Sequence, residues 1–165
     1  MTTPPHHPLP LLFLDIDGPL IPFGGTDYPT YGSVDSSNPL LSRLNPAYGP
    51  QLRSLPCDLV WATTWMSDAN TCIAPLLGLP PLPVLDLDHP DPSPRGLHWK
   101  TPAVVDWAAG RPFAWVDDEI TPQDHTWVST HHPAEALLLT VNPHRGLTPA
   151  NFTTLTTWLR NHQPS

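Results

Sequence analysis

Five short apolar runs, each of strand length, alternate with longer segments along this chain. They cover residues 9–14, 59–62, 82–87, 112–116 and 136–141. The runs are apolar at successive positions, which is typical of strands covered on both faces. Strands separated by helical segments favour βαβ units, so the sequence predicts a three-layer α/β sandwich with a mostly parallel central sheet. A further short edge strand is expected over residues 124–129.

Helices are expected in four of the intervening segments. The pairs Thr101-Pro102 and Thr148-Pro149 each combine a good N-cap with proline at the first helical position. They predict one helix to about residue 109 and another near the C-terminus. A third helix is predicted from Ser67-Asp68 to about residue 77, because a glycine and two prolines follow. A fourth, over residues 38–55, is expected to be broken near Pro46.

The length and composition fit one domain. With 165 residues and a hydrophobic fraction of 39%, the chain can bury one sizeable core, whereas a second domain would be cramped. We expect residues 1–8 to be a loose lead-in and residues 9–165 to form a single α/β domain. No run approaches the ~18 apolar residues of a membrane span, and the N-terminus lacks a signal-peptide pattern. A cytoplasmic protein without membrane contact is expected.

The charge of the chain limits its possible partners. The formal net charge is −8 with seven basic residues and no basic run, which argues against nucleic-acid binding through a broad electrostatic surface. A phosphorylated substrate is compatible with this charge, because a bound metal can supply local positive charge. The balance favours a small phosphorylated molecule over a nucleic acid and leaves a homo-oligomer open. Cys57 and Cys72 lack metal-type spacing and are expected to be free thiols.

One apolar run ends abruptly in two aspartates. Residues 13–18 read Phe-Leu-Asp-Ile-Asp-Gly, so Asp15 and Asp17 stand at the end of a predicted buried strand, and Gly18 marks a turn. In an open α/β sheet the carboxyl ends of the strands form the ligand site. Two carboxylates held together there repel each other unless a cation joins them, which indicates a metal site. Taken alone, an ordinary acidic turn explains the motif equally well.

Three further features extend this pattern. The strand at 59–62 ends in Thr63-Thr64, whose hydroxyls could donate to a phosphate oxygen or could simply cap the strand. Lys100 is the only lysine and stands at a predicted helix start, where its ammonium could reach a phosphate or pair with a carboxylate. The strand at 112–116 runs into Asp117-Asp118-Glu119, a second buried strand followed by acids.

In their order and spacing, these four features resemble the motifs of the haloacid dehalogenase (HAD) superfamily. The resemblance spans about residues 9–141 and implies a Rossmann-like fold. Residues 61–65 and 115–119 also resemble small uncharacterised HAD-domain proteins of actinobacteria, a likeness that supplies no substrate. The segments between the motifs are too short for a full cap domain, so an essentially capless protein with an open site is expected.

The resemblance implies a Mg²⁺-dependent phosphohydrolase that works through an aspartyl-phosphate. Asp15 would be the nucleophile, and Asp17 would protonate the leaving oxygen and then activate water. Thr63, or Thr64 if the register is off by one, would hydrogen-bond the phosphoryl oxygens. Lys100 would offset the negative charge, which a carboxylate nucleophile needs when it attacks a phosphate dianion. A phosphotransferase, or a non-catalytic module that binds metal or phosphate, would use the same residues.

The resemblance also implies a metal site and a phosphate cradle. Mg²⁺ would be held by Asp15, by Asp117 with Asp118 beside it, and by the backbone carbonyl of Asp17. This set suits Mg²⁺, which prefers few carboxylates and several waters. Backbone N–H groups of the turn at Ile16, Asp17 and Gly18 would cradle the phosphate.

Some positions permit two interpretations. Pro19 departs from the family pattern and removes one N–H, which is expected to affect the motion of the turn modestly. Residues 19–38 are either a functional loop over the strand end or a surface excursion. Trp65 is either a core residue or a pocket residue that stacks on a ring-bearing substrate. The histidines, His98 among them, show no metal-ligand spacing and are expected on the surface or in loops.

Overall fold

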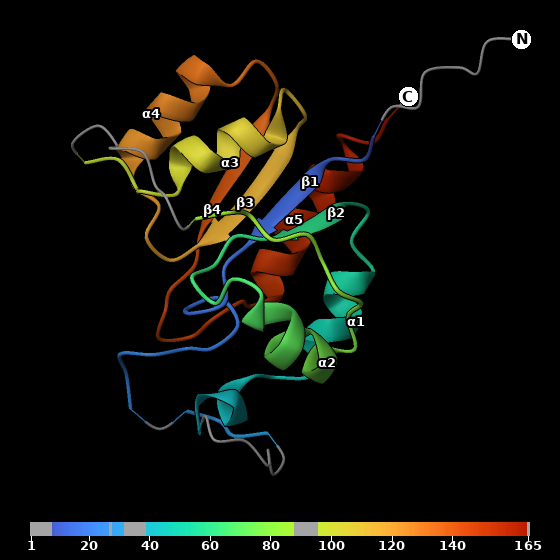
Figure 1. Cartoon of the computed structure of the whole chain (residues 1–165), viewed down its shortest axis with the longest axis vertical. Helices are drawn as coiled ribbons and strands as arrows, with labels where there is room; N and C mark the ends of the chain where they lie inside the picture. The colour runs from blue at the N-terminus through green and yellow to red at the C-terminus, as the bar shows by residue number, and fades with distance from the viewer. Residues whose placement is uncertain (1–7, 27, 32–38, 88–95, 165) are drawn as a thin grey trace, which may run out of the picture.

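The structure, a computed structural model, describes residues 8–26, 28–31, 39–87 and 96–164; nearly all of the expected lead-in lies outside this part of the chain. Its centre is a four-stranded sheet in the order β2-β1-β3-β4, with every neighbouring pair parallel (Figure 1). The strands are β1 (Leu11–Leu14), β2 (Asp58–Trp61), β3 (Phe113–Asp117) and β4 (Ala136–Thr140). The predicted Rossmann-like α/β fold is confirmed.

Helices cover both faces of the sheet and complete three layers (Figure 1). One face carries α3 (Thr101–Ala108) and α4 (Pro122–His131). The other carries α1 (Tyr48–Arg53), α2 (Ala74–Leu77) and α5 (Pro149–Arg160). A 3₁₀ turn over Pro39–Arg43 precedes α1, and a π-helical turn over Ala69–Ile73 leads into α2. Among the described residues, no helix combines the length and apolar character needed to cross a membrane.

Successive residues of the central strand pack into different cores. Leu12 and Leu14 of β1 join the core that contains α1, α2 and α5, while Leu11 and Phe13 join the core that contains α3 and α4. All four side chains are at most 2% exposed. This two-sided burial explains why the strands are apolar at both parities. Because all four strands are parallel, the residues that follow their carboxyl ends meet at one edge of the sheet.

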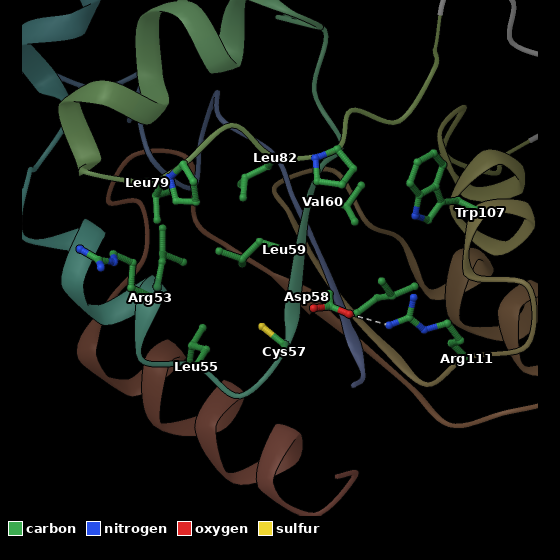
Figure 2. Close-up of a pocket in the computed structure, with 14 residues that line it drawn as sticks. Arg53, Leu55, Cys57, Asp58, Leu59, Val60, Leu79, Leu82, Trp107 and Arg111 are labelled. Carbon is green, nitrogen blue, oxygen red and sulfur yellow. Dashed lines mark hydrogen bonds and ion pairs between the residues drawn. The ribbon is translucent and has the colours of Figure 1, made fainter. Parts of the chain in front are cut away.

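The predicted fifth strand at 82–87 is reduced to one bridge. Val84 pairs with Trp61 of β2, and the Trp61 N–H donates to the Pro83 carbonyl at 2.9 Å. The prolines of residues 80–83 have no N–H to donate, so the segment cannot continue the ladder. Beside the first half of β2 lies a cavity of about 530 Å³, lined mainly by apolar side chains (Figure 2).

The edge strand predicted at 124–129 is wrong, because these residues lie within α4. Thr121 and Asp124 form a capping box: the Thr121 hydroxyl accepts from the Asp124 N–H, and the Asp124 carboxylate accepts from the Thr121 N–H at 2.8 Å. Pro122 follows the cap at the first helical position, where proline favours a helix. These start signals outweigh the weak apolar pattern that favoured a strand.

Of the two threonine–proline pairs that were predicted to begin helices, one has threonine as the N-cap and the other does not. Thr148 caps α5 through a reciprocal box with Asn151, as the sequence predicts. At the other pair, Lys100 is the cap residue, and α3 begins one residue earlier than expected, at Thr101. The Thr101 hydroxyl instead donates to the buried carboxylate of Asp124 at 2.7 Å, which ties the start of α3 to α4.

Candidate active site

Asp15 and Asp17 lie in a tight turn that follows β1. The turn closes on itself, since the Ile21 N–H donates to the Ile16 carbonyl and the Gly18 N–H donates to the Ile21 carbonyl, both at 2.9 Å. The Ile16 N–H lies 2.8 Å from the Asp15 carboxylate oxygen Oδ1 and donates to it. The structure therefore engages the N–H groups of Ile16 and Gly18, two of the three expected at the phosphate, within the turn itself.

Gly18 brings the turn against the acidic segment after β3. Its φ is +101°, and a Cβ at this position would lie 2.9 Å from the Cγ of Asp118. The carbonyl of the next residue, Pro19, accepts a hydrogen bond from the Leu147 N–H at 2.8 Å. The turn is thus fixed from two sides, and any side chain larger than hydrogen at position 18 displaces Asp118.

Gly18→Ala should weaken metal binding, whereas Gly78→Ala should not. Both glycines have positive φ, so each substitution carries a strain of about 1–3 kcal/mol. A Cβ on Gly78 meets nothing within 4 Å, whereas one on Gly18 meets Asp118. We expect a lower melting temperature in both variants, with the larger loss in Gly18→Ala because of the contact with Asp118, and a loss of Mg²⁺ affinity in Gly18→Ala alone, measured by calorimetry. Equal affinities in both would contradict a role for the Gly18–Asp118 contact.

Lys100 joins the ends of three strands. Its Nζ lies 2.9 Å from Oδ2 of Asp117, 3.3 Å from Oδ1 of Asp15 and 3.0 Å from the carbonyl oxygen of Ala62. The residue is only 4% exposed. The three donors of the ammonium are therefore directed at oxygens at the carboxyl ends of β1, β2 and β3. The lone lysine of the sequence is a buried bridge between two carboxylates.

The charges of this cluster shift one another. Burial raises the pKa of Asp15 to about 8; Lys100 opposes this effect and Asp117 adds to it. Burial acts in the same direction on Asp117, but its contact with His98 and the charge of Lys100 outweigh burial and hold its pKa below the usual range. Burial opposes the charge of Lys100, yet the two carboxylates prevail and raise its pKa. Lys100 and Asp117 are thus an ion pair beside an acid that favours its neutral form.

Asp15, Asp117 and Asp118 could hold a metal ion. One carboxylate oxygen from each lies within 4.8 Å of the others, and burial together with the charge of Asp117 raises the pKa of Asp118 to about 6. Burial and the neighbouring charge of Asp117 make two of these three oxygen donors, Asp15 and Asp118, resist ionisation. Such a set is expected where a divalent cation completes the charge balance. The carboxylate of Asp17 lies outside this group, and its predicted part in the metal site is through its backbone carbonyl.

Mg²⁺ binding should strengthen with pH and release protons. Asp15 and Asp118 have pKa values raised to about 8 and 6, so below these values each must lose a proton before it can bind a cation. We expect at least a tenfold gain in affinity between about pH 5.5 and about pH 8.5. Calorimetry near neutral pH, in two buffers of different ionisation enthalpy, should show about one proton released. A pH-independent affinity would exclude this set as the binding site.

Asp17 is held by a tryptophan. The indole Nε1–H of Trp65 points at both carboxylate oxygens of Asp17, at 3.2 and 3.3 Å. The ring itself packs against the core that contains α1, α2 and α5. The ring of Trp65 packs on the core, which is one of the two interpretations of its sequence position, and Trp65 is not among the described residues that line the cavity that contains the carboxylates. Its polar edge instead orients the second aspartate.

The two threonines after β2 occupy different environments. Thr63 is fully buried, and its hydroxyl accepts from the Trp65 N–H at 3.2 Å. Thr64 is exposed and lines the cavity that contains the carboxylates. Both hydroxyls lie in the turn after β2, as the sequence predicts, and Thr64 is the one on the cavity wall.

The cavity at this edge measures about 190 Å³. It is lined by Asp15, Asp17, Phe23, Thr64, Trp99, Lys100, Asp117, Asp118 and Glu119. The predicted aspartates and the lysine therefore meet in one hollow. Phe23 and Trp99 were not predicted. Trp99 adjoins Lys100 and Phe23 stands five residues after Gly18, but a lone aromatic residue in a loop carries no sequence signal of its own.

The family comparison agrees with this arrangement. Residues 11–152 match the family model described as the HAD domain in Swiss Army Knife RNA repair proteins. The chain belongs to this HAD family. Comparisons with curated proteins and with solved structures gave no significant match. Membership of the HAD superfamily, expected from the four motifs, is thereby confirmed.

This HAD domain carries a buried histidine that the sequence did not reveal. The Nδ1 of His98 accepts from the Lys100 N–H at 3.1 Å, so the hydrogen is on Nε2, which faces Oδ1 of Asp117 at 3.5 Å and Oε2 of Glu119 at 3.7 Å. The His98 N–H donates to Asp124 at 2.8 Å. His98 lies in the loop before α3, which is one of the two positions expected for the histidines, but it is 7% exposed and is therefore buried there and not on the surface. Its position two residues before Lys100 is the one signal that could have indicated it.

Proposed function

We propose that this HAD domain is a Mg²⁺-dependent phosphohydrolase that forms an aspartyl-phosphate on Asp15. The observation that carries the proposal is the Lys100 bridge, which holds a buried nucleophile candidate and a metal-ligand candidate, Asp15 and Asp117, on one ammonium. Asp17 stands two residues from Asp15 and is oriented by Trp65, which suits an acid/base that acts on the same phosphorus.

The first step transfers the phosphoryl group to the protein. An Asp15 oxygen attacks phosphorus and forms a new O–P bond, while the bond from phosphorus to the leaving oxygen breaks. The proton of Asp17 goes to that leaving oxygen. Lys100 offsets the negative charge that attacker and phosphate share.

The second step returns the protein to its starting state. Asp17, now ionised, takes a proton from water as the water oxygen attacks phosphorus. The bond from Asp15 to phosphorus breaks, which releases inorganic phosphate and restores the Asp15 carboxylate. Mg²⁺, when held by Asp15, Asp117 and Asp118, would neutralise charge on the phosphoryl oxygens and lower the repulsion between the anions.

The substrate that we propose is a terminal phosphate of RNA. The family is described as the HAD domain of RNA repair proteins, and this description supports the assignment. The site also suits a substrate end, because Thr64 and Glu119 on its rim are exposed. The net charge of −8 favours a substrate held by its last nucleotide over one held along its backbone.

The test is a phosphate-release assay with and without Mg²⁺. The substrates are an aryl phosphate, nucleoside monophosphates, and short RNAs with a 3′ or a 5′ terminal phosphate. Metal-dependent release, strongly reduced in Asp117→Asn, is expected. Transfer to an added alcohol in place of water would establish a phosphotransferase, and no release from any ester would exclude the proposed hydrolase.

A second arm tests the intermediate directly. An aryl phosphate has a good leaving group and needs little acid catalysis, whereas hydrolysis of the intermediate needs a base. Asp17→Asn with this substrate and Mg²⁺ should therefore accumulate protein that carries one phosphoryl group on Asp15, seen by mass spectrometry after acid quenching. Turnover without any phosphoprotein in this variant would point to direct attack by water.

A further inference from the structure

Phe23 exposes an aromatic ring at the candidate active site. It is 40% exposed, one of three large hydrophobic side chains with that character among the described residues; the others are Leu76 and Trp107. Of the three, Phe23 alone lines the cavity that contains the carboxylates. A phenyl ring has no polar atom, so at this position it can bind a ligand only through apolar contact or stacking.

The backbone of Phe23 is fixed on both sides. Its N–H donates to the Pro143 carbonyl at 2.8 Å, and its carbonyl accepts from Nδ1 of His144 at 3.0 Å. Gly24 packs so closely on His144 that a Cβ there would lie 2.9 Å from the imidazole Cε1. The ring is thus presented from a pinned segment, which lowers the entropy lost when a flat ligand settles on it.

The charges of the cavity lining do not favour electrostatic binding of the sugar–phosphate backbone of a nucleic acid. Among the described residues that line the cavity, the only cation is Lys100, which is buried between Asp15 and Asp117. Glu119, with a side chain 67% exposed, adds negative charge to the rim. A substrate that continues beyond the reacting phosphate therefore meets no positive charge among these lining residues, and its affinity must come from another source.

We propose that Phe23 determines specificity by stacking on the base of a nucleoside phosphate, either free or at the end of an RNA strand. The inference rests on the proposed function and adds the group that the site recognises beside the phosphate. Every base has an aromatic face, and stacking on a protein ring is worth about 1–3 kcal/mol per base. This contribution does not depend on salt, in contrast to phosphate contacts.

The test compares two esters that differ in the base. Phe23→Ala should raise KM for nucleoside monophosphates about 5- to 150-fold and leave kcat nearly constant, because stacking acts equally on bound substrate and transition state. For ribose 5-phosphate, which lacks a base, the change should be several-fold smaller. Phe23→Trp should retain the preference for the base. Leu76→Ala, which removes a side chain of similar exposure (38%) outside the cavity lining, is the control that leaves both activities intact.

The outcomes separate this inference from the proposed function. Equal losses on both esters, or a wild-type protein that does not prefer the base, would overturn the stacking role while hydrolysis stands. Equilibrium binding of the nucleoside monophosphates to wild type and Phe23→Ala is measured in parallel, so the inference is tested even if no ester is hydrolysed. A lower KM for the phosphorylated RNA than for the mononucleotide, with the same dependence on Phe23, would show that the nucleoside phosphate bound at the site is the end of an RNA strand.

Discussion

Asp15→Asn is expected to abolish turnover and to raise the melting temperature of the metal-free protein in alkaline buffer. The activity falls by about 10⁴-fold or more, because an amide cannot form the acyl-phosphate bond. The stability rises because the substitution removes a buried charge. An acid whose folded pKa is raised from 3.8 to about 8 destabilises the fold progressively as pH increases through this window.

The expected gain in melting temperature of Asp15→Asn depends on pH. Near pH 4 Asp15 is protonated in the folded protein, and asparagine should bring little change. Above about pH 8 the folded protein must ionise Asp15, and here asparagine should raise the melting temperature by several degrees. Mg²⁺ should stabilise the wild type and reduce the difference, since the cation compensates the same charge.

Asp58→Asn is the matched control for Asp15→Asn. Asp58 begins β2, its side chain is 56% exposed, and it pairs with Arg111 at 2.9 Å. An exposed ion pair contributes about 0–1 kcal/mol, so this variant should remain active and lose little stability. If the melting temperature of Asp15→Asn changed with pH in parallel with that of the wild type, Asp15 would not carry the buried charge.

Lys100→Met is expected to have the second-largest effect. It leaves Asp15 and Asp117 crowded without their shared cation, and loss of one partner from a buried charge cluster typically destabilises by about 3–5 kcal/mol. Turnover should fall by about 10³-fold or more, because the negative charge of the reaction is no longer offset. Lys100→Arg should also lose most activity, since a planar guanidinium cannot direct its donors at three oxygens around one nitrogen position.

A double variant distinguishes a lost charge balance from a lost packing contact. If the instability of Lys100→Met comes from repulsion between Asp15 and Asp117, then Asp15→Asn in the same chain should restore much of the melting temperature. If the changes in melting temperature of the two single variants simply add in the double variant, the lysine stabilises the protein by filling space. Arg53→Met, which removes an exposed cation from α1, should change neither stability nor activity appreciably.

The sequence predicted those parts of the fold that a strong local pattern specifies. The apolar runs correctly indicated four parallel strands, of which β1 and β3 are buried throughout, and the strand ends placed Asp15 and Asp117 at one edge, where Lys100 at the start of α3 meets them. The run at 82–87 has a similar composition but forms a single bridge, because Pro83 has no N–H with which to extend the ladder toward the start of β2. Residues 124–129 form part of α4, because the capping box of Thr121 and Asp124 begins a helix just before them.

What the sequence could not reveal depends on long-range contacts. His98 becomes part of the site because its Nδ1 accepts from the Lys100 backbone, and Asp124 ties the Lys100 segment to α4 because the helix starts converge. Phe23 reaches the cavity because its backbone is bound to residues 143 and 144, far away in the chain. No spacing rule connects such positions before the fold is known.

The failed fifth strand has a consequence for the behaviour of the protein in solution. At the first half of β2 no further strand within the described part of the chain covers the sheet edge, and an uncovered edge with leucine side chains beside it can recruit a strand from another molecule. Pro80 and Pro83 line the cavity beside this edge, and proline has no N–H with which to pair with such a strand. We therefore expect the prolines that end the sheet to hinder edge-to-edge aggregation.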